Sequence, residues 1–166
     1  MMELDDLDVI IRDFPLFAGL SKLERRVIKR CARLAPYKKG DIIYAEGSPP
    51  SAFYCLILGR VVIYTLGEDG KENILEHLHH GKYFGVISLL TNESHSVSAK
   101  ATNDSSLLII DKEDFDCILA KLPRLAIDLS RMLSRRLKRK DIHQKTIFES
   151  TVVSVFSSYS QAGKTI

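Results

Sequence analysis

Apolar residues recur at helical spacing in the segment that follows Ser21. Five positions share one face of such a helix: Leu23, Val27, Ile28, Cys31 and Leu34. Ser21 and Glu24 form a Ser-x-x-Glu capping box, in which each side chain accepts a hydrogen bond from the other residue's backbone N–H group. The pattern therefore predicts a helix over about residues 21 to 34 with one apolar face, ended by Pro36 and Gly40.

The pattern changes between residues 36 and 111, where β-branched and aromatic residues dominate. Turn-forming residues interrupt this region at Gly47-Ser48-Pro49-Pro50, Gly67-Glu68-Asp69-Gly70 and Asn103-Asp104. Asp69-Gly70 separates two apolar runs, and glycine supplies the positive φ that a tight hairpin turn requires. We therefore expect several short strands joined by tight turns, in a sandwich or roll, with a hairpin at Asp69-Gly70.

Helical spacing returns after Asp111. A short helical stretch begins with Asp114, Phe115, Ile118 and Leu119, and Pro123 interrupts it. A long helix is expected to start near Pro123, and one stripe of this helix is apolar: Leu122, Leu125, Ala126, Leu129, Met132, Leu133 and Leu137. The chain therefore divides into an N-terminal helical segment (1–35), a β-roll (36–111), C-terminal helices (112–148) and a final segment (149–166).

The composition is that of an ordinary globular chain of one domain. Hydrophobic residues make up 45% of the 166 residues and charged residues 27%. No apolar run approaches the roughly 20 residues that span a bilayer. The acidic start, from Met1 to Asp8, lacks the basic region of a signal peptide. We therefore expect a cytoplasmic protein with no membrane partner.

The cysteines and the charge exclude further classes of protein. Cys31, Cys55 and Cys117 are far apart, so we expect core thiols rather than a disulfide framework or an iron–sulfur site. A net charge of +3 is too small to indicate nucleic-acid binding by itself. The basic run 135–140 is typical of a solvated helix end, where cations complement the helix dipole. A nucleic-acid partner is therefore not expected.

Histidines near residue 78 raise the question of a metal site. His77 and His79 would share one face of a strand, with Glu76 on the other face. Two imidazoles fall short of a tetrahedral zinc site, so we expect these residues and His80 to be exposed or to line a pocket, with no metal bound.

The chain also contains no Gly-x-Ser-x-Gly nucleophile elbow, and no paired carboxylates mark a cleft. We therefore expect no enzyme activity.

One stretch carries the most information about function. It is Phe84-Gly85-Val86-Ile87-Ser88-Leu89-Leu90, followed by His95-Ser96-Val97-Ser98. It resembles the phosphate-binding cassette of the cyclic-nucleotide-binding domains, which reads roughly Phe-Gly-Glu-Leu-Ala-Leu-Leu and then Pro-Arg-Ser/Ala-Ala. The resemblance implies a site formed by Phe84, Gly85, Val86, Ile87, Ser88, His95, Ser96 and Val97, with cyclic AMP or cyclic GMP as the candidate effector.

The resemblance extends over about residues 14 to 140. It is carried by Pro15-Leu16-Phe17-Ala18-Gly19-Leu20-Ser21, Lys39-Gly40-Asp41-Ile42-Ile43, Glu46-Gly47, Tyr54, Leu58-Gly59-Arg60-Val61 and Asp69-Gly70, which follow in the family's order. It implies a mainly β fold, a jelly-roll of the double-stranded β-helix type with N-terminal helices and a long C-terminal helix. In the family this helix closes the pocket and pairs in a homodimer, so we expect a homodimer through residues 122–148. The alternative is that the apolar stripe packs on its own β-roll.

Two positions depart from the family's pattern. Val86 replaces the Glu that takes the ribose 2′-hydroxyl, and His95 replaces the Arg that takes the cyclic phosphate. An Arg is permanently charged and pairs with phosphate through two hydrogen bonds, whereas a His is only partly charged near neutral pH. We therefore expect a regulatory domain that senses a small effector but binds cyclic AMP or cyclic GMP weakly. The alternative is a ligand-free structural, dimerisation or protein-interaction domain.

The last segment has a pattern of its own. Residues 151–156 have the composition of a buried strand, and the run after them ends in Gly163-Lys164-Thr165. These three residues match the end of a P-loop, in which Lys reaches phosphate and the hydroxyl holds Mg²⁺, while Ser158 replaces its first Gly. The segment also resembles the start of the partitioning-type ATPases. We therefore hypothesise that the chain is a fragment whose next domain is NTPase-like; the alternative is a tail that matches by chance.

Overall fold

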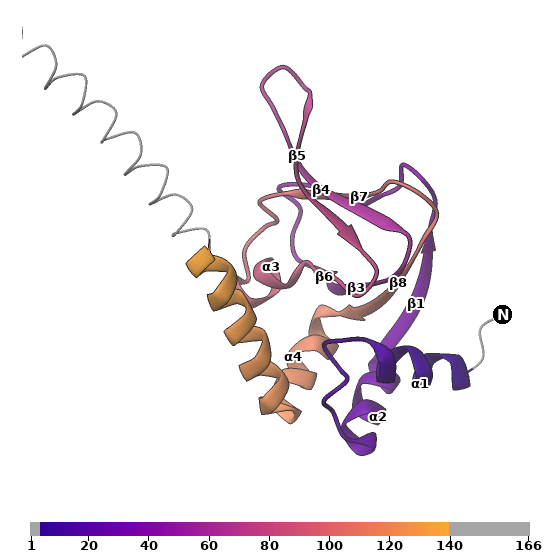
Figure 1. Ribbon diagram of the computed structural model, residues 1–166. Helices are drawn as coiled ribbons and strands as arrows, with labels where there is room; N and C mark the ends of the chain where they lie inside the picture. Colours follow the sequence, from indigo (N-terminus) through magenta and orange to yellow (C-terminus); the bar gives the residue numbers. More distant parts are fainter. Residues whose placement is uncertain (1–3, 140–166) are drawn as a thin grey trace, which may run out of the picture. The chain divides into compact units, whose positions relative to one another are not determined.

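The computed structural model describes residues 4–139 of the chain. These belong to two compact units, which divide between Leu122 and Pro123. The first unit begins with two helices, α1 (Leu4–Asp13) and α2 (Lys22–Cys31). The strands follow in the order β1 (Ala32–Tyr37), β2 (Ile42–Tyr44), β3 (Ala52–Leu58), β4 (Arg60–Leu66), β5 (Glu72–His79), β6 (Tyr83–Phe84), β7 (Ser98–Ala101) and β8 (Ser105–Asp111). Helix α3 (Val86–Thr91) lies between β6 and β7, and α4 (Lys112–Lys121) follows β8 (Figure 1).

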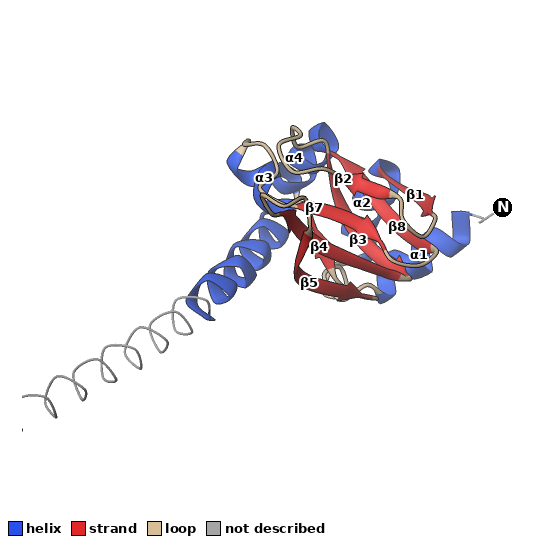
Figure 2. Cartoon of the chain, turned by 90° about the horizontal axis from the view of Figure 1, so that it is seen from above, coloured by secondary structure: helices blue, strands red, loops and turns tan. Residues whose placement is uncertain are grey.

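The strands form two four-stranded sheets. Their orders are β1-β8-β3-β6 and β2-β7-β4-β5, and the pairings within them are antiparallel. Strands from the two ends of the β region pair with each other, β1 with β8 and β2 with β7, so the chain is wound back on itself as a roll (Figure 2). This arrangement confirms the predicted fold class, a mainly β jelly-roll with flanking helices.

Helix α2 begins as predicted but ends earlier. The capping box is formed, since the Ser21 N–H group donates to Glu24 Oε2 over 2.7 Å and the Glu24 N–H group donates to Ser21 Oγ over 3.3 Å. The predicted end at about residue 34 is wrong, because Ala32 is already extended and pairs with β8. Leu34 and Pro36 lie in β1. Proline is tolerated there because β1 is an edge strand, with β8 as its one neighbour in the sheet.

The predicted hairpin at Asp69-Gly70 is confirmed. It joins β4 to β5, and Gly70 has a φ of +75°. The Gly67 N–H group donates to the Lys71 carbonyl oxygen over 2.8 Å and closes the turn. The tip of this hairpin rises away from the rest of the first unit (Figure 1).

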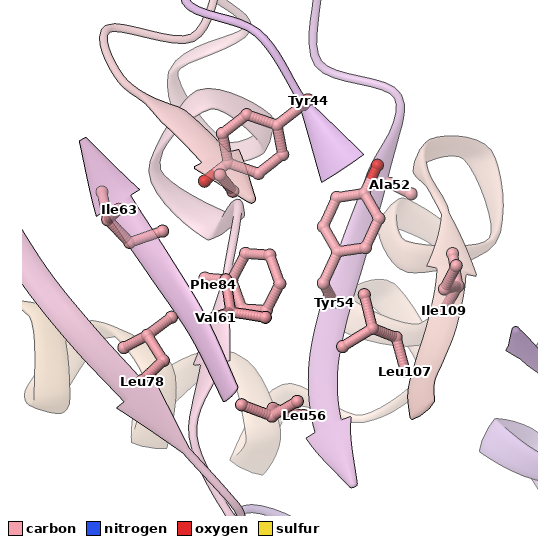
Figure 3. Packing of buried hydrophobic residues seen from close by; sticks show 11 residues of the cluster. Tyr44, Ala52, Tyr54, Leu56, Val61, Ile63, Leu78, Phe84, Leu107 and Ile109 are labelled. Atoms are coloured by element: carbon pink, nitrogen blue, oxygen red, sulfur yellow. The ribbon is translucent and has the colours of Figure 1, made fainter. Parts of the chain in front are cut away.

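Alternate residues of the central strands fill the space between the two sheets. Leu56, Val61 and Leu107 are fully buried there, and their neighbours include Tyr54 and Phe84 (Figure 3). The cluster as a whole consists of Tyr44, Ala52, Tyr54, Leu56, Val61, Ile63, Leu78, Phe84, Ala99, Leu107 and Ile109. Burial of this apolar surface is the main contribution to the stability of the roll.

The other face of the first sheet is also buried, against helix α4. The rings of Phe53 in β3 and Phe115 in α4 stack with centroids 5.0 Å apart. Cys55 lies on the same strand face as Phe53, and its burial raises the pKa of the thiol. Cys31 is half-buried and Cys117 is exposed. The expectation of core thiols is therefore confirmed for Cys55 and wrong for Cys117, which lies on the solvent face of α4.

The second unit contains one helix among its described residues, 123–139. Its start confirms the helix predicted to begin near Pro123, and proline is favoured in the first turn because the N–H group it lacks would have no intrahelical partner. The predicted continuation through residue 148 lies outside the described residues. No helix in the part of the chain described, 4–139, has both the length and the apolar character needed to cross a membrane.

Candidate functional site

The cassette predicted from the sequence begins where β6 passes into α3. Phe84 ends β6 and is buried, and Gly85 precedes the helix with a φ of +81°. A Cβ atom at residue 85 would lie 3.0 Å from Tyr54 Cδ2 and 3.2 Å from the Ala52 carbonyl oxygen. Residue 85 must therefore be a glycine for two reasons, its left-handed backbone and the close approach of β3.

Helix α3 presents two different faces. Val86, Ser88 and Leu89 are buried, whereas Ile87 and Leu90 are exposed. The sequence of α3 carries no charged residue. The structure thus places Val86 and Ser88 inside the protein, while the Ile87 side chain, 60% exposed, points away from the predicted site.

His95 is almost completely buried, with 3% of its surface exposed. Its imidazole lies parallel to the Tyr44 ring, with the centroids 3.8 Å apart and the planes 8° from parallel. The His95 N–H group donates to the Ser48 carbonyl oxygen over 2.9 Å, and the Gly47 N–H group donates to the His95 carbonyl oxygen over 2.7 Å. The turn after β2 and the residues that follow α3 are therefore held together by both backbone and side chain.

The imidazole of His95 is left with an unsatisfied atom. Nε2 is buried and has no hydrogen-bond partner among the described residues. Burial lowers the pKa of His95 below its ordinary value of 6.5, because the charged ring would lose hydration. The ring is therefore uncharged at neutral pH and offers neither the charge nor the paired donors of an arginine.

The residues after His95 lie in different surroundings. Ser96 is exposed, Val97 is half-buried and Ser98 is buried. The Ser98 hydroxyl accepts a hydrogen bond from the Glu46 N–H group over 2.8 Å. Ser96, which the resemblance placed in the site, is thus not gathered with His95 into one buried group.

An aromatic cluster adjoins His95. Tyr54 and Phe84 stack with centroids 5.2 Å apart, and Tyr44 lies 5.7 Å from Tyr54 and 6.0 Å from Phe84 (Figure 3). Burial raises the pKa of Tyr44, so its phenol stays protonated. Sequence reasoning missed Tyr44 and gave no role to Ser98. The only signal for Tyr44 was an aromatic residue in a short β segment, which does not indicate its partner.

His77 and His79 lie on one face of β5, as expected, with the buried Leu78 between them. Both are exposed, and with Arg60 they line a shallow hollow of about 240 Å³. Among the described residues, no three His, Cys, Asp or Glu side chains are grouped so that they could hold a metal ion.

The P-loop-like residues Gly163, Lys164 and Thr165 lie outside the described residues. The idea of an NTPase-like segment therefore stays a prediction.

Comparison with known proteins agrees with the fold. Residues 34–121 match the family model described as "Cyclic nucleotide-binding domain". The "Cyclic AMP receptor protein" of Thermus thermophilus is 33% identical over 128 residues, which are 77% of this chain and 59% of that protein.

Two solved structures are similar. The Thermus thermophilus catabolite activator protein has a TM-score of 0.73 at 32% identity, covering 80% of this chain and 62% of that one. The sensor domain of the transcriptional regulator DNR from Pseudomonas aeruginosa has a TM-score of 0.72 at 27% identity, covering 82% of this chain and 92% of that one. The chain spans about three fifths of its Thermus relatives and nearly all of a sensor domain. It belongs to the cyclic nucleotide-binding domain family and has the fold of that family's regulatory domains.

Proposed function

We propose that this chain is an effector-sensing regulatory domain whose site is the cassette, residues 84–98, and that it binds cyclic AMP and cyclic GMP only weakly. The observation that carries the proposal is His95, a buried polar side chain in the cassette whose Nε2 has no partner among the described residues. Buried polar atoms are nearly always hydrogen-bonded, so an unsatisfied one requires an explanation, and in this proposal its partner is an atom of the effector.

Weak binding follows from the two replaced residues. Val86 is buried and apolar where the family's Glu accepts the ribose hydroxyl, and His95 is uncharged where the family's Arg pairs with phosphate. Hydrogen bonds to charged groups contribute about 1.5 to 3 kcal/mol each. Loss of both would weaken binding by roughly two to four powers of ten if the two losses add.

The backbone at the start of α3 supports an effector site over an empty fold. Gly85 keeps the left-handed turn into α3, and Ser88 keeps a small polar side chain on the buried face. An effector with an apolar part would suit Val86 better than a ribose would.

Regulation requires that occupancy of the cassette favours one state of another element of the protein over a second state. In this proposal that element is the helix beginning at residue 123, which also pairs with the same helix of a second copy. The support is its apolar stripe, including Leu137, which is 63% exposed in the single chain.

A second candidate function is a ligand-free dimerisation or protein-interaction domain. It is favoured by the aromatic cluster, because Tyr44, Tyr54 and Phe84 pack against one another on the interior side of the cassette. Side chains packed in this way leave less room for a nucleotide than an open pocket does.

Calorimetric titration with cyclic AMP and cyclic GMP tests the proposal. The chain is compared with the double variant Val86→Glu, His95→Arg, and Ile87→Glu serves as control because it adds the same carboxylate on the exposed face. Weak binding by the chain and tight binding by the double variant would support the proposal. Absence of binding by both, with folding verified by circular dichroism, would favour the ligand-free function.

A further inference from the structure

His95 combines three features that seldom occur together. Its side chain is buried, one face of its ring is covered by Tyr44 at 3.8 Å, and its Nε2 has no hydrogen-bond partner among the described residues. An imidazole nitrogen can act as a donor or as an acceptor, and the choice depends on protonation. The side chain can therefore change both its charge and its hydrogen-bonding role without moving.

The described contacts of His95 are made with uncharged groups. The Tyr44 ring, from β2, stacks on His95, and the raised pKa of Tyr44 keeps its phenol neutral. Tyr54 lies next to Tyr44. The turn after β2 contacts His95 through backbone groups of Gly47 and Ser48. Burial lowers the pKa of His95, and the charged side chains nearest to these groups in the sequence are Glu46, next to Gly47, and Glu93, two residues before His95.

We propose that effector binding at this site is linked to protons: the cassette takes up an anionic effector of the phosphate type together with one proton, which His95 receives on its free imidazole nitrogen. The inference rests on the proposed function and adds its regulation. With the proton in place, the imidazolium donates a charge-assisted hydrogen bond to the oxyanion. Without the proton, His95 offers no charge to an anion.

The direction of the pH dependence follows from the two states of His95. In the free chain its pKa lies below 6.5, because burial disfavours the charged ring. An anion bound beside the ring stabilises the charged form and raises the pKa. Between these two pKa values binding takes up a proton, so affinity rises as pH falls, by up to about tenfold per pH unit. Above the higher pKa and below the lower one, affinity no longer changes with pH.

Cyclic AMP is a suitable probe, because its phosphodiester stays ionised over the whole range in which histidine titrates. Adenosine is the matched control without the anion. Binding of both is measured by calorimetry at several pH values between about 5.5 and 8, where histidine changes charge. Each titration is repeated in two buffers that differ in ionisation enthalpy, which gives the number of protons taken up, and circular dichroism shows that the chain is folded at each pH.

We expect cyclic AMP to bind more tightly as pH falls, with the uptake of nearly one proton per bound molecule. The affinity for adenosine should not depend on pH in this way. His95→Arg should bind cyclic AMP with little dependence on pH, because its charge is permanent. His95→Gln should lose the proton uptake. Histidine NMR signals should also show that the pKa of His95 rises when cyclic AMP is added.

The results separate this inference from the proposed function. If cyclic AMP binds with equal affinity at every pH and no proton is taken up, the proton linkage is overturned. The proposed effector site would still be supported, because cyclic AMP binds. Proton uptake that persists in His95→Gln would also overturn the proton linkage, because another group would then be responsible. Failure of cyclic AMP to bind at any pH in a folded chain would overturn both.

Discussion

The imidazole of His95 lies flat against the phenol ring of Tyr44, 3.8 Å away and within 8° of parallel. This contact joins β2 to the segment after α3, and the backbone hydrogen bonds from His95 to Ser48 and from Gly47 to His95 reinforce it. Tyr44 is also part of the core between the sheets. The position of His95 is therefore determined by the core of the roll.

Replacing Tyr44 tests how far this contact stabilises the fold. Tyr44→Ala removes a buried ring from the core and one face of the His95 stack, and we expect a loss of about 3 to 5 kcal/mol in the free energy of unfolding by urea. Tyr44→Phe keeps the ring and should lose less than about 1.5 kcal/mol. Equal losses in the two variants would show that the hydroxyl, not the ring, supplies the stability.

The burial of His95 predicts a pH dependence of stability in the absence of any ligand. Its pKa in the folded chain is lower than the 6.5 of the unfolded chain, so the unfolded state binds more protons below that pH. The contribution of His95 is complete above about pH 6.5 and is lost as pH falls toward its folded pKa. Stability should therefore decrease with acidification.

His95→Gln isolates this contribution from that of the carboxylates. Urea unfolding of the chain and of the variant is compared at about pH 7.5 and about pH 5.5. The loss of stability on acidification should be smaller in His95→Gln. A variant that loses as much stability as the chain does would contradict the burial of a neutral His95.

Gly85 offers a test of the cassette's backbone with a matched control. Gly85 and Gly70 both have positive φ, +81° and +75°, so alanine is strained at either position. A Cβ atom at residue 85 would lie 3.0 Å from Tyr54 Cδ2, whereas one at residue 70 would meet no atom within 4 Å. Gly85→Ala should therefore cost about 1 to 3 kcal/mol more than Gly70→Ala in thermal or urea unfolding. An equal loss of stability in the two variants would mean that β3, which lies next to residue 85, shifts to accommodate the added methyl group.

Much of this fold could be predicted from the sequence because its signals are local. The capping box at Ser21 and the turn at Asp69-Gly70 each depend on neighbouring residues, and both formed. The end of α2 was predicted three residues too late, since apolar residues at 31 and 34 fit helical spacing while pairing with β8 decided the structure.

The candidate site was predictable only in part. The motif located Gly85, Val86 and His95, because the glycine and the spacing of the other two residues from it can be read in a single sequence. The stack of His95 on Tyr44 joins a loop residue after α3 to a residue of β2 that is distant in the sequence, and no local pattern encodes it. Exposure of Ser96 likewise depends on how the segment after α3 is held, which the motif does not specify.

The apolar stripe of the helix beginning at residue 123 predicts a homodimer that a single surface change should weaken. Leu137 is on this stripe and 63% exposed in the single chain, while the adjacent Lys138 is off it and exposed. Burial of a leucine side chain contributes about 1.5 to 3 kcal/mol, and a symmetric dimer buries it twice. Leu137→Gln should therefore raise the dissociation constant at least about tenfold in sedimentation equilibrium, whereas Lys138→Gln should leave it nearly unchanged. A chain that sediments as a monomer at all accessible concentrations would contradict the dimer and leave the stripe to pack within its own chain.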